Sequence, residues 1–176
     1  ENGNLLEEDK QTATEETESS EETTDKEEAN ADEADSDEEE AAEAEADEAE
    51  AELEAAIEVE NDLRSEIVTY ALQFVGNRYK YGGTNPNTGV DCSGFTSYVM
   101  RHAAEVELPH SSGGQSRMGR QVSSSEMRPG DIICYGSGKR INHVALYIGN
   151  GQIVHASTER TGIKVSRWNY RTPVRI

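Results

Sequence analysis

The sequence predicts an α+β domain, with N-terminal helices packed on an antiparallel sheet, preceded by a disordered acidic segment. Three observations support this prediction. Residues 1–62 hold 29 of the 36 acidic residues of the 176-residue chain. In the remainder, amphipathic helical patterns come first, and short strand-like runs follow them as a block. Helices followed by consecutive strands favour an antiparallel sheet over alternating βαβ units.

Residues 1–62 carry a net charge of −27 and contain no aromatic residue, cysteine or proline. Because such a segment cannot bury enough apolar surface to offset the entropy lost on ordering, we expect a disordered leader or linker. Residues 40–60, rich in Ala and Glu, have at most marginal helicity, since like charges repeat at helical spacing. A plain spacer is the default role, and contact with the basic domain at low ionic strength is the alternative.

Residues 63–176 carry a net charge of +7 and include every aromatic residue and both cysteines. Their length suits one compact domain. The basic residues are scattered without an aromatic-interleaved platform, which argues against nucleic-acid binding, and no apolar run reaches the roughly eighteen residues of a membrane span. The chain starts at Glu1 without an initiator methionine, which a removed signal peptide or a trimmed terminus would explain.

The domain is expected to begin with a helix that starts near Asn61, a possible N-cap, and stops at Gly76. A second helix begins around Cys92, because apolar side chains recur from Phe95 at three- and four-residue spacing. The turn signal Arg-Pro-Gly-Asp at residues 128–131 then introduces a meander of strands. We expect these strands at residues 131–136, 143–149, 152–157, 163–168 and 173–176.

Cys92 is the strongest candidate for a functional residue. It falls in the first turn of its expected helix, where unpaired N–H groups and the helix dipole favour the thiolate, the reactive form of cysteine. His143 and His155 follow in strand-like segments and supply the base and the orienting group that a thiol nucleophile needs. Cys134 lies in an apolar run and is expected to be a small buried hydrophobic residue.

The Gly-Asn-Gly loop at residues 149–151 decides whether the two histidines can cooperate. With a two-residue turn and regular pairing, His143 and His155 would lie on opposite faces of the sheet. With a three-residue loop, residue 145 faces residue 155, and the imidazoles become diagonal neighbours on one face, about 7–8 Å apart. We therefore predict the three-residue loop, with a positive φ at Gly151.

In this arrangement His143 would accept the proton of Cys92 and later donate it to the leaving amine, while His155 orients the first imidazole. Backbone N–H groups at the helix start, including that of Cys92, would stabilise the oxyanion. The phenol of Tyr81 is a further candidate for this role.

The two other histidines, His102 and His110, are expected to be structural or exposed, although His110 could border the cleft. The sequence lacks the Cys-x-x-Cys and His-x-Glu spacings that accompany a catalytic zinc cysteine. We therefore expect no metal.

Six motifs occur along the chain in the order found in one known family. They are Tyr79-Lys-Tyr81-Gly82-Gly83, Asp91-Cys92-Ser93-Gly94-Phe95, Leu108-Pro109 with Ser112 to Gln115, Arg128-Pro129-Gly130-Asp131, His143-Val-Ala-Leu-Tyr147-Ile-Gly149 and Ile153-Val154-His155-Ala156. With them, residues 63–176 resemble the NlpC/P60 family of papain-like cysteine peptidases, which trim bacterial cell-wall peptides. The Cys motif followed by two His motifs is the specific part of the pattern.

The resemblance implies hydrolysis of the bond between D-γ-glutamyl and a diamino acid in peptidoglycan stem peptides, through a thioester intermediate. Carried over position by position, Cys92 is the nucleophile, His143 the base and His155 the third member of a Cys-His-His triad. No cofactor is implied. The partner is the stem peptide, and we expect a monomer that is secreted or associated with the bacterial cell wall.

By the same resemblance, Asp91 and Ser93 line the substrate side of the cleft and Tyr81 is an active-site phenol. Tyr79 is the alternative ring to face the thiol. Two other functions stay open at this point: a Cys-His amidase or acyltransferase on a related scaffold, and a catalytically inactive wall-binding module.

Overall fold

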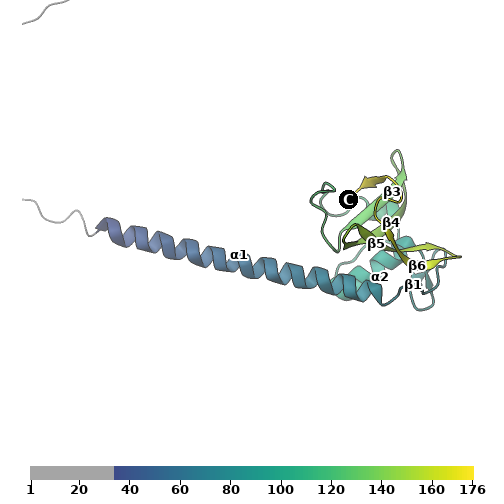
Figure 1. Ribbon diagram of the computed structural model, residues 1–176, viewed down its shortest axis with the longest axis horizontal. Helices are drawn as coiled ribbons and strands as arrows, with labels where there is room; N and C mark the ends of the chain where they lie inside the picture. Colours follow the sequence, from purple (N-terminus) through teal and green to yellow (C-terminus); the bar gives the residue numbers. More distant parts are fainter. Residues whose placement is uncertain (1–33) are drawn as a thin grey trace, which may run out of the picture. The chain divides into compact units, whose positions relative to one another are not determined.

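A computed structural model describes the backbone of residues 34–176 and the side chains from residue 46 onward. The chain divides into two units, Glu1–Glu45 and Ala46–Ile176, and the second unit contains both cysteines and the whole sheet. This unit combines helices with a five-stranded antiparallel sheet (Figure 1), so the predicted α+β class is confirmed. Of the disorder predicted for residues 1–62, the part over residues 1–33 lies outside the described residues, and residues 34–62 are helical instead.

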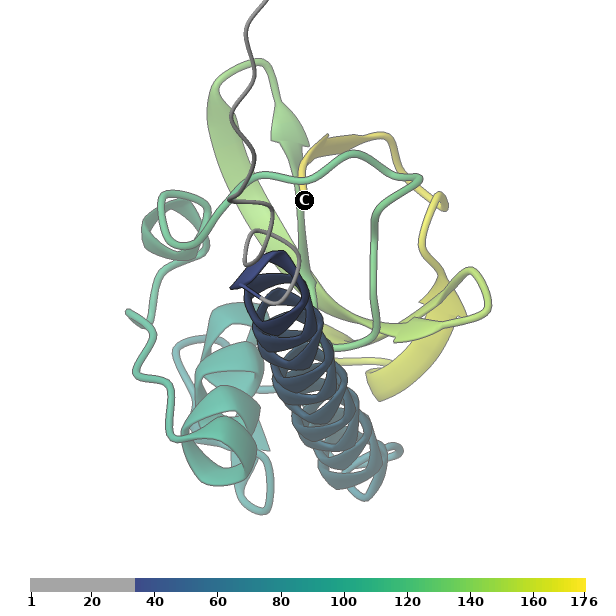
Figure 2. The ribbon, with the colours of Figure 1, turned by 90° about the vertical axis from the view of Figure 1, so that its left-hand side faces the viewer.

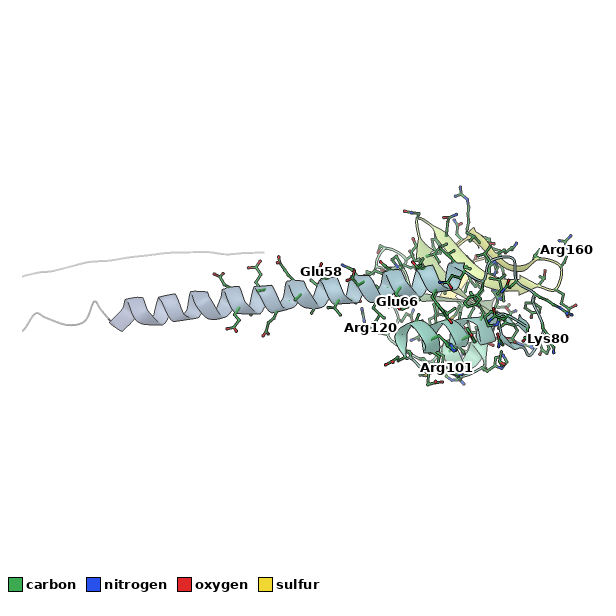
Figure 3. All side chains as sticks on the ribbon, turned by 90° about the horizontal axis from the view of Figure 1, so that it is seen from below. Glu58, Glu66, Lys80, Arg101, Arg120 and Arg160 are labelled. Atoms are coloured by element: carbon green, nitrogen blue, oxygen red, sulfur yellow. The ribbon has the colours of Figure 1, made fainter. Side chains whose placement is uncertain are left out.

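The first helix, α1, runs without interruption from Ala34 to Leu72. The helix start predicted at Asn61 is therefore wrong: the helix continues through this residue, and its carbonyl accepts a hydrogen bond from Ser65 Oγ (2.9 Å). Ala and Glu are good helix formers, and the side chains of residues 46–60 are all exposed, so that water solvates their charges. Figure 3 shows side chains such as Glu58 projecting outward from α1.

The expectation of at most marginal helicity over residues 40–60 also differs from the structure, which has a continuous helix there. The helix also passes without a break through residue 62, where the boundary between leader and domain was expected. The division into residues 1–62 and 63–176 stays a prediction.

The C-terminal part of α1 packs beside the second helix, α2, which spans Cys92–Ala104 (Figure 2). Phe74, in the turn that follows α1, contacts Phe95 of α2 edge to face, with ring centroids 6.4 Å apart. Together with Ile67 and Val99 these rings belong to one buried cluster that includes Leu146 of the sheet. Burial of such side chains contributes about 1.5–3 kcal/mol each, which stabilises the position of α2 against the sheet.

The large sheet has the strand order β6-β5-β4-β3-β7, and all its pairs are antiparallel. The strands are β3 (Ile132–Ser137), β4 (Arg140–Gly149), β5 (Gln152–Thr158), β6 (Gly162–Arg167) and β7 (Pro173–Arg175). All five predicted strands are confirmed, and β4 begins three residues earlier than predicted because it pairs with β3 through a tight turn. A two-residue pair, β1 (Thr84–Asn85) with β2 (Gly89–Val90), was not predicted.

The connection between β4 and β5 differs in detail from the prediction but gives the predicted register. Gly149 pairs with Gln152, so the turn itself has two residues. One position earlier, Ile148 is an extra residue in a bulge, and beyond it Tyr147 pairs with Ile153. The bulge shifts the pairing by one residue, as a three-residue loop would have done.

Three consecutive positive φ angles build this connection: 90° at Gly149, 51° at Asn150 and 70° at Gly151. The last confirms the positive φ predicted for Gly151. Glycine and asparagine are the residues that adopt this conformation most readily, which explains the Gly-Asn-Gly sequence.

The third helix, α3 (Ser112–Gln115), is held against α2 by one buried amide. Gln115 Nε2 donates to the carbonyls of Ser93 (2.8 Å) and Pro109 (2.9 Å) and to Ser97 Oγ (2.9 Å). Its Oε1 accepts from Thr96 Oγ1 at 2.6 Å. Because the side chain is only 4% exposed, these bonds fix the segment before α3 against the start of the cysteine helix.

Replacing Gly149 with alanine should lower the free energy of unfolding by about 1–2 kcal/mol, because a Cβ is strained at a φ of 90°. Urea denaturation measures the change. Asn150→Gly is the matched control and should leave stability within a few tenths of a kcal/mol, since glycine accepts the same φ. Equal stability of Gly149→Ala and the wild type would show that this turn does not need its glycine.

Candidate functional site

Cys92 is the first residue of α2, as predicted. The helix starts here because Asp91 has an extended backbone and caps it: the N–H of Gly94 donates to Asp91 Oδ1 at 2.8 Å. The capping carboxylate leaves the N–H groups of Cys92 and Ser93 available next to the thiol. A thiol at this position can meet a substrate carbonyl and the donors that would stabilise its oxyanion.

The carboxylate of Asp91 forms hydrogen bonds with other groups of the protein. Besides its cap, it accepts from Ser93 Oγ (3.2 Å) and from the N–H of Gly82 (3.0 Å), and it contacts His110 Nε2 (2.9 Å). Asp91 is 9% and Ser93 5% exposed. The structure gives both residues a role in fixing the helix start, and the substrate contact predicted for them stays a prediction.

The glycines of two motifs allow the chain to pass close to the helix start. A Cβ on Gly94 would lie 2.2 Å from the carbonyl oxygen of Gly83, and one on Gly83 would lie 2.2 Å from that of Gly89. No side chain fits at these separations. The Gly-Gly and Cys-Ser-Gly motifs are thus two sides of one backbone contact beside Cys92.

The two predicted imidazoles meet. His143 Nε2 lies 2.7 Å from His155 Nδ1, the rings are steeply inclined at 74°, and both side chains are buried. The pairing of Leu146 with Val154 sets this register, and it confirms that the histidines share one face of the sheet. The other nitrogen of His155, Nε2, contacts Ser166 Oγ at 3.0 Å.

The backbone N–H of Val144, the residue after His143, lowers the pKa of the Cys92 thiol, and α2 contacts β4, so the cysteine end of α2 lies against this part of β4. Burial raises the pKa of Cys92, and the charge of Asp91 adds to this rise. Backbone N–H groups lower this pKa, but by less than burial and Asp91 raise it; they are those of Val144, Ser93 and Cys92. The N–H groups at the helix start thus favour the thiolate as predicted, but desolvation is the larger effect and the pKa of the thiol is raised overall.

Burial also keeps both imidazoles neutral. It lowers the pKa of His143 to about 4, with a further contribution from the cation of Arg171. It lowers the pKa of His155 to about 3, with contributions from His143 and Lys164. At neutral pH the site thus contains an uncharged thiol and an uncharged imidazole that can accept its proton.

Two tyrosines were candidates for the phenol near the thiol, and their positions differ. The ring of Tyr81 is 83% exposed. Tyr79 is half-buried, and its pKa is raised by burial and then by the nearby charges of Cys92 and Asp91. The effect of Cys92 on the pKa of Tyr79 favours Tyr79 as the ring near the thiol. The predicted role of Tyr81 as an active-site phenol stays a prediction.

Several side chains around the imidazoles were not identified from the sequence. Tyr135 packs 5.9 Å from His143, and its hydroxyl donates to the carbonyl of Trp168. Tyr170 packs 5.4 Å from the ring of His155. The strand register could have revealed Ser166: because His155 pairs with Lys164, Ser166 is its diagonal neighbour on the same face.

The remaining histidines and the second cysteine are not part of this group. His102 is exposed and stacks on Tyr98, with ring centroids 4.0 Å apart, and His110 holds Asp91. Cys134 is 2% exposed, as predicted, and its pKa is raised by burial to about 11. It borders a separate cavity of about 470 Å³, whose lining includes none of the residues Cys92, His143 and His155.

Among the described side chains, no three His, Cys, Asp or Glu residues converge as metal ligands would. No helix in the described part of the chain combines the length and the apolar character needed to cross a bilayer.

Comparison with known proteins identifies residues 76–173 as a match to the NlpC/P60 family. The chain is 41% identical over 108 residues to the murein DD-endopeptidase MepS/murein LD-carboxypeptidase of Escherichia coli K12. The aligned residues are 61% of this chain and 56% of that protein. The chain is also 42% identical over 98 residues to the probable endopeptidase p60 of Listeria seeligeri, covering 56% of this chain and 18% of that protein. The chain thus spans about half or less of these relatives.

Solved structures show the same fold. The NlpC/p60 domain of the peptidoglycan hydrolase SagA is 32% identical and superposes with a TM-score of 0.59, covering 64% of this chain and 95% of that one. The peptidoglycan hydrolase RipB of Mycobacterium tuberculosis is 30% identical with a TM-score of 0.57, covering 66% of this chain and 62% of that one.

A methyl group at Gly94 should displace the start of α2, because it would overlap the carbonyl oxygen of Gly83. We expect Gly94→Ala to lower the rate of alkylation of Cys92 by iodoacetamide and to lower the melting temperature by several degrees. Gly113→Ala is the matched control, since nothing lies within 4 Å of its added Cβ. Wild-type behaviour of Gly94→Ala would contradict the close contact.

The neutral imidazoles predict that the protein is less stable in mild acid. The pKa values of His143 and His155 lie below that of an unfolded histidine, near 6.5, so the unfolded chain binds more protons between these values. Stability from this source is complete above about pH 6.5 and is lost as the pH falls towards 4. Between pH 7.5 and 5.5 the free energy of unfolding should drop by about 1.3 kcal/mol for each imidazole, or by about 2.7 kcal/mol for the two together.

Urea denaturation at the two pH values measures this drop, and carboxylates contribute little because they titrate at lower pH. NMR titration of the ring C–H signals provides the control, since both buried rings should remain neutral at pH 5.5. A midpoint near pH 6.5 for either ring would refute the assignment.

Proposed function

The chain belongs to the NlpC/P60 family, and on this premise we propose that it hydrolyses peptide bonds in peptidoglycan stem peptides with Cys92 as the nucleophile. The observation that carries the proposal is the 2.7 Å contact between His143 Nε2 and His155 Nδ1 on the strand whose backbone also reaches the thiol. A thiol nucleophile needs a base and a group that orients the base. The buried imidazole pair supplies both.

In the first half of the proposed reaction, the sulfur of Cys92 attacks the carbonyl carbon while its proton passes to His143. Because burial holds the pKa of His143 at about 4, its ring is available as a base at neutral pH. The tetrahedral intermediate then collapses: the C–N bond breaks, His143 returns the proton to the leaving amine, and a thioester remains on Cys92.

In the second half, His143 takes a proton from water, and the resulting hydroxide attacks the thioester. The C–S bond breaks, the carboxyl product leaves, and the proton returns to the sulfur of Cys92. Backbone N–H groups at the start of α2 are proposed to stabilise both oxyanions. Tyr79 is proposed as an additional donor, because its ring lies within electrostatic reach of the thiol.

We propose the bond between D-γ-glutamyl and the diamino acid as the scissile bond. A second candidate comes from the E. coli relative, whose name describes a DD-endopeptidase and an LD-carboxypeptidase. The same thiol chemistry would serve all three reactions, since they differ in which residues flank the carbonyl. The products distinguish them: a cut inside the stem, a separated cross-link or a lost terminal residue.

The charge of the domain is consistent with a substrate in the cell wall. The domain of residues 63–176 carries a net charge of +7, which favours its approach to anionic wall polymers. We propose that the protein acts outside the cytoplasm, at the cell wall, and as a monomer, because one chain contains every proposed catalytic group.

Cys92→Ala should abolish the release of peptides from purified peptidoglycan, because it removes the sulfur that would form the proposed thioester. Mass spectrometry of the soluble fragments is the measurement and also identifies the bond. Cys134→Ala is the matched control, since this thiol borders a different cavity, and it should retain activity. Equal activity of Cys92→Ala and the wild type would refute the proposal.

The same fragments test the remaining alternatives. An amidase would release stem peptides from the glycan, and an acyltransferase would give products extended by the acceptor. An inactive wall-binding module would give no products and would sediment with peptidoglycan equally well with and without Cys92.

A further inference from the structure

His155 lies between two polar groups and is sealed from water. Its Nδ1 is 2.7 Å from His143 Nε2, its Nε2 is 3.0 Å from Ser166 Oγ, and its side chain is 1% exposed. A neutral imidazole carries one N–H donor and one acceptor nitrogen. In each hydrogen bond His155 is therefore either the donor or the acceptor. Because the neutral ring has a single N–H, donating at one nitrogen means accepting at the other.

Only one direction allows His143 to act as the base. To accept a proton on Nδ1, the nitrogen not held by His155, a neutral His143 must carry its hydrogen on Nε2. This Nε2–H then donates to His155 Nδ1, so His155 must carry its own hydrogen on Nε2. That hydrogen points at Ser166 Oγ, which accepts it.

The opposite direction disables the base. If His155 carried its hydrogen on Nδ1, it would donate to His143 Nε2, and His143 would carry its hydrogen on Nδ1. The nitrogen needed for the thiol proton would then be occupied. A serine hydroxyl can either accept from an Nε2–H of His155 or donate to a bare Nε2, so the active state requires that Ser166 Oγ accepts.

We propose that Ser166 is a positioning residue whose hydroxyl accepts the Nε2–H of His155 and thereby leaves Nδ1 of His143 free for the proton of the thiol. Ser166 is held in place by β6, where it pairs with Ile153 and lies diagonally across from His155. Without this hydroxyl, a buried N–H would lack a partner in the active tautomer. This inference rests on the proposed roles of Cys92 and His143.

The test combines a spectroscopic and a kinetic readout. In protein labelled with ¹⁵N at histidine, the ring nitrogen shifts report which nitrogen carries hydrogen. We expect Nε2–H on both His143 and His155 in the wild type, and a shift of both rings towards Nδ1–H in Ser166→Ala. The rate of peptide release in Ser166→Ala should fall by about tenfold to a hundredfold.

Ser166→Thr retains the hydroxyl and should restore both the tautomers and most of the rate. Ser124→Ala is the matched control, because this exposed serine lies in the loop before β3 that borders the separate cavity, and it should behave as the wild type. A purely structural role for Ser166 would lower stability without changing the tautomers.

The two proposals fail in different ways. If the wild type released no peptides but showed both rings as Nε2–H, only the proposed function would be refuted. If His155 carried its hydrogen on Nδ1 in the wild type, or if Ser166→Ala left the tautomers unchanged, the role of Ser166 would be refuted whatever the activity.

Discussion

The candidate site depends on the register between β4 and β5. Side chains alternate between the two faces of a strand, so a shift of one residue would move one imidazole to the opposite face. The bulge at Ile148 supplies the one residue that brings His143 and His155 to the same face. A short connection with three positive φ angles therefore determines whether a 2.7 Å contact between two buried rings can exist.

Backbone contacts have a comparable role at the other half of the site. The start of α2 is fixed by the cap of Asp91, by the close passage of Gly83 past Gly94, and by the buried amide of Gln115. The polar side chains next to Cys92 in the sequence thus mainly fix the backbone of the helix start through hydrogen bonds. A substrate would meet the thiol and backbone N–H groups at a helix start that these contacts hold in place.

Burial decides the charge state of the site. A thiol at a helix start is commonly associated with a lowered pKa, but desolvation outweighs the N–H groups at Cys92 and raises it. The same burial holds His143 and His155 neutral. Both partners of the proposed proton transfer are therefore uncharged at rest, and charge would develop only when the sulfur attacks. The direction of hydrogen bonding through the pair then becomes the property that matters.

The sequence by itself determined the α+β class, the five strands, the place of Cys92 in the first turn of its helix and the shared face of His143 and His155, because periodicity and turn residues are local signals. It did not determine where α1 begins, because the competition between helix propensity and charge repulsion around Asn61 has no sharp local marker. Only the tertiary structure decided that Asp91 is buried, that Tyr79 is half-buried while Tyr81 is exposed, and that Ser166 reaches His155. These outcomes depend on which segments pack together and on how much water they exclude, and neither quantity is encoded in any single stretch of the chain.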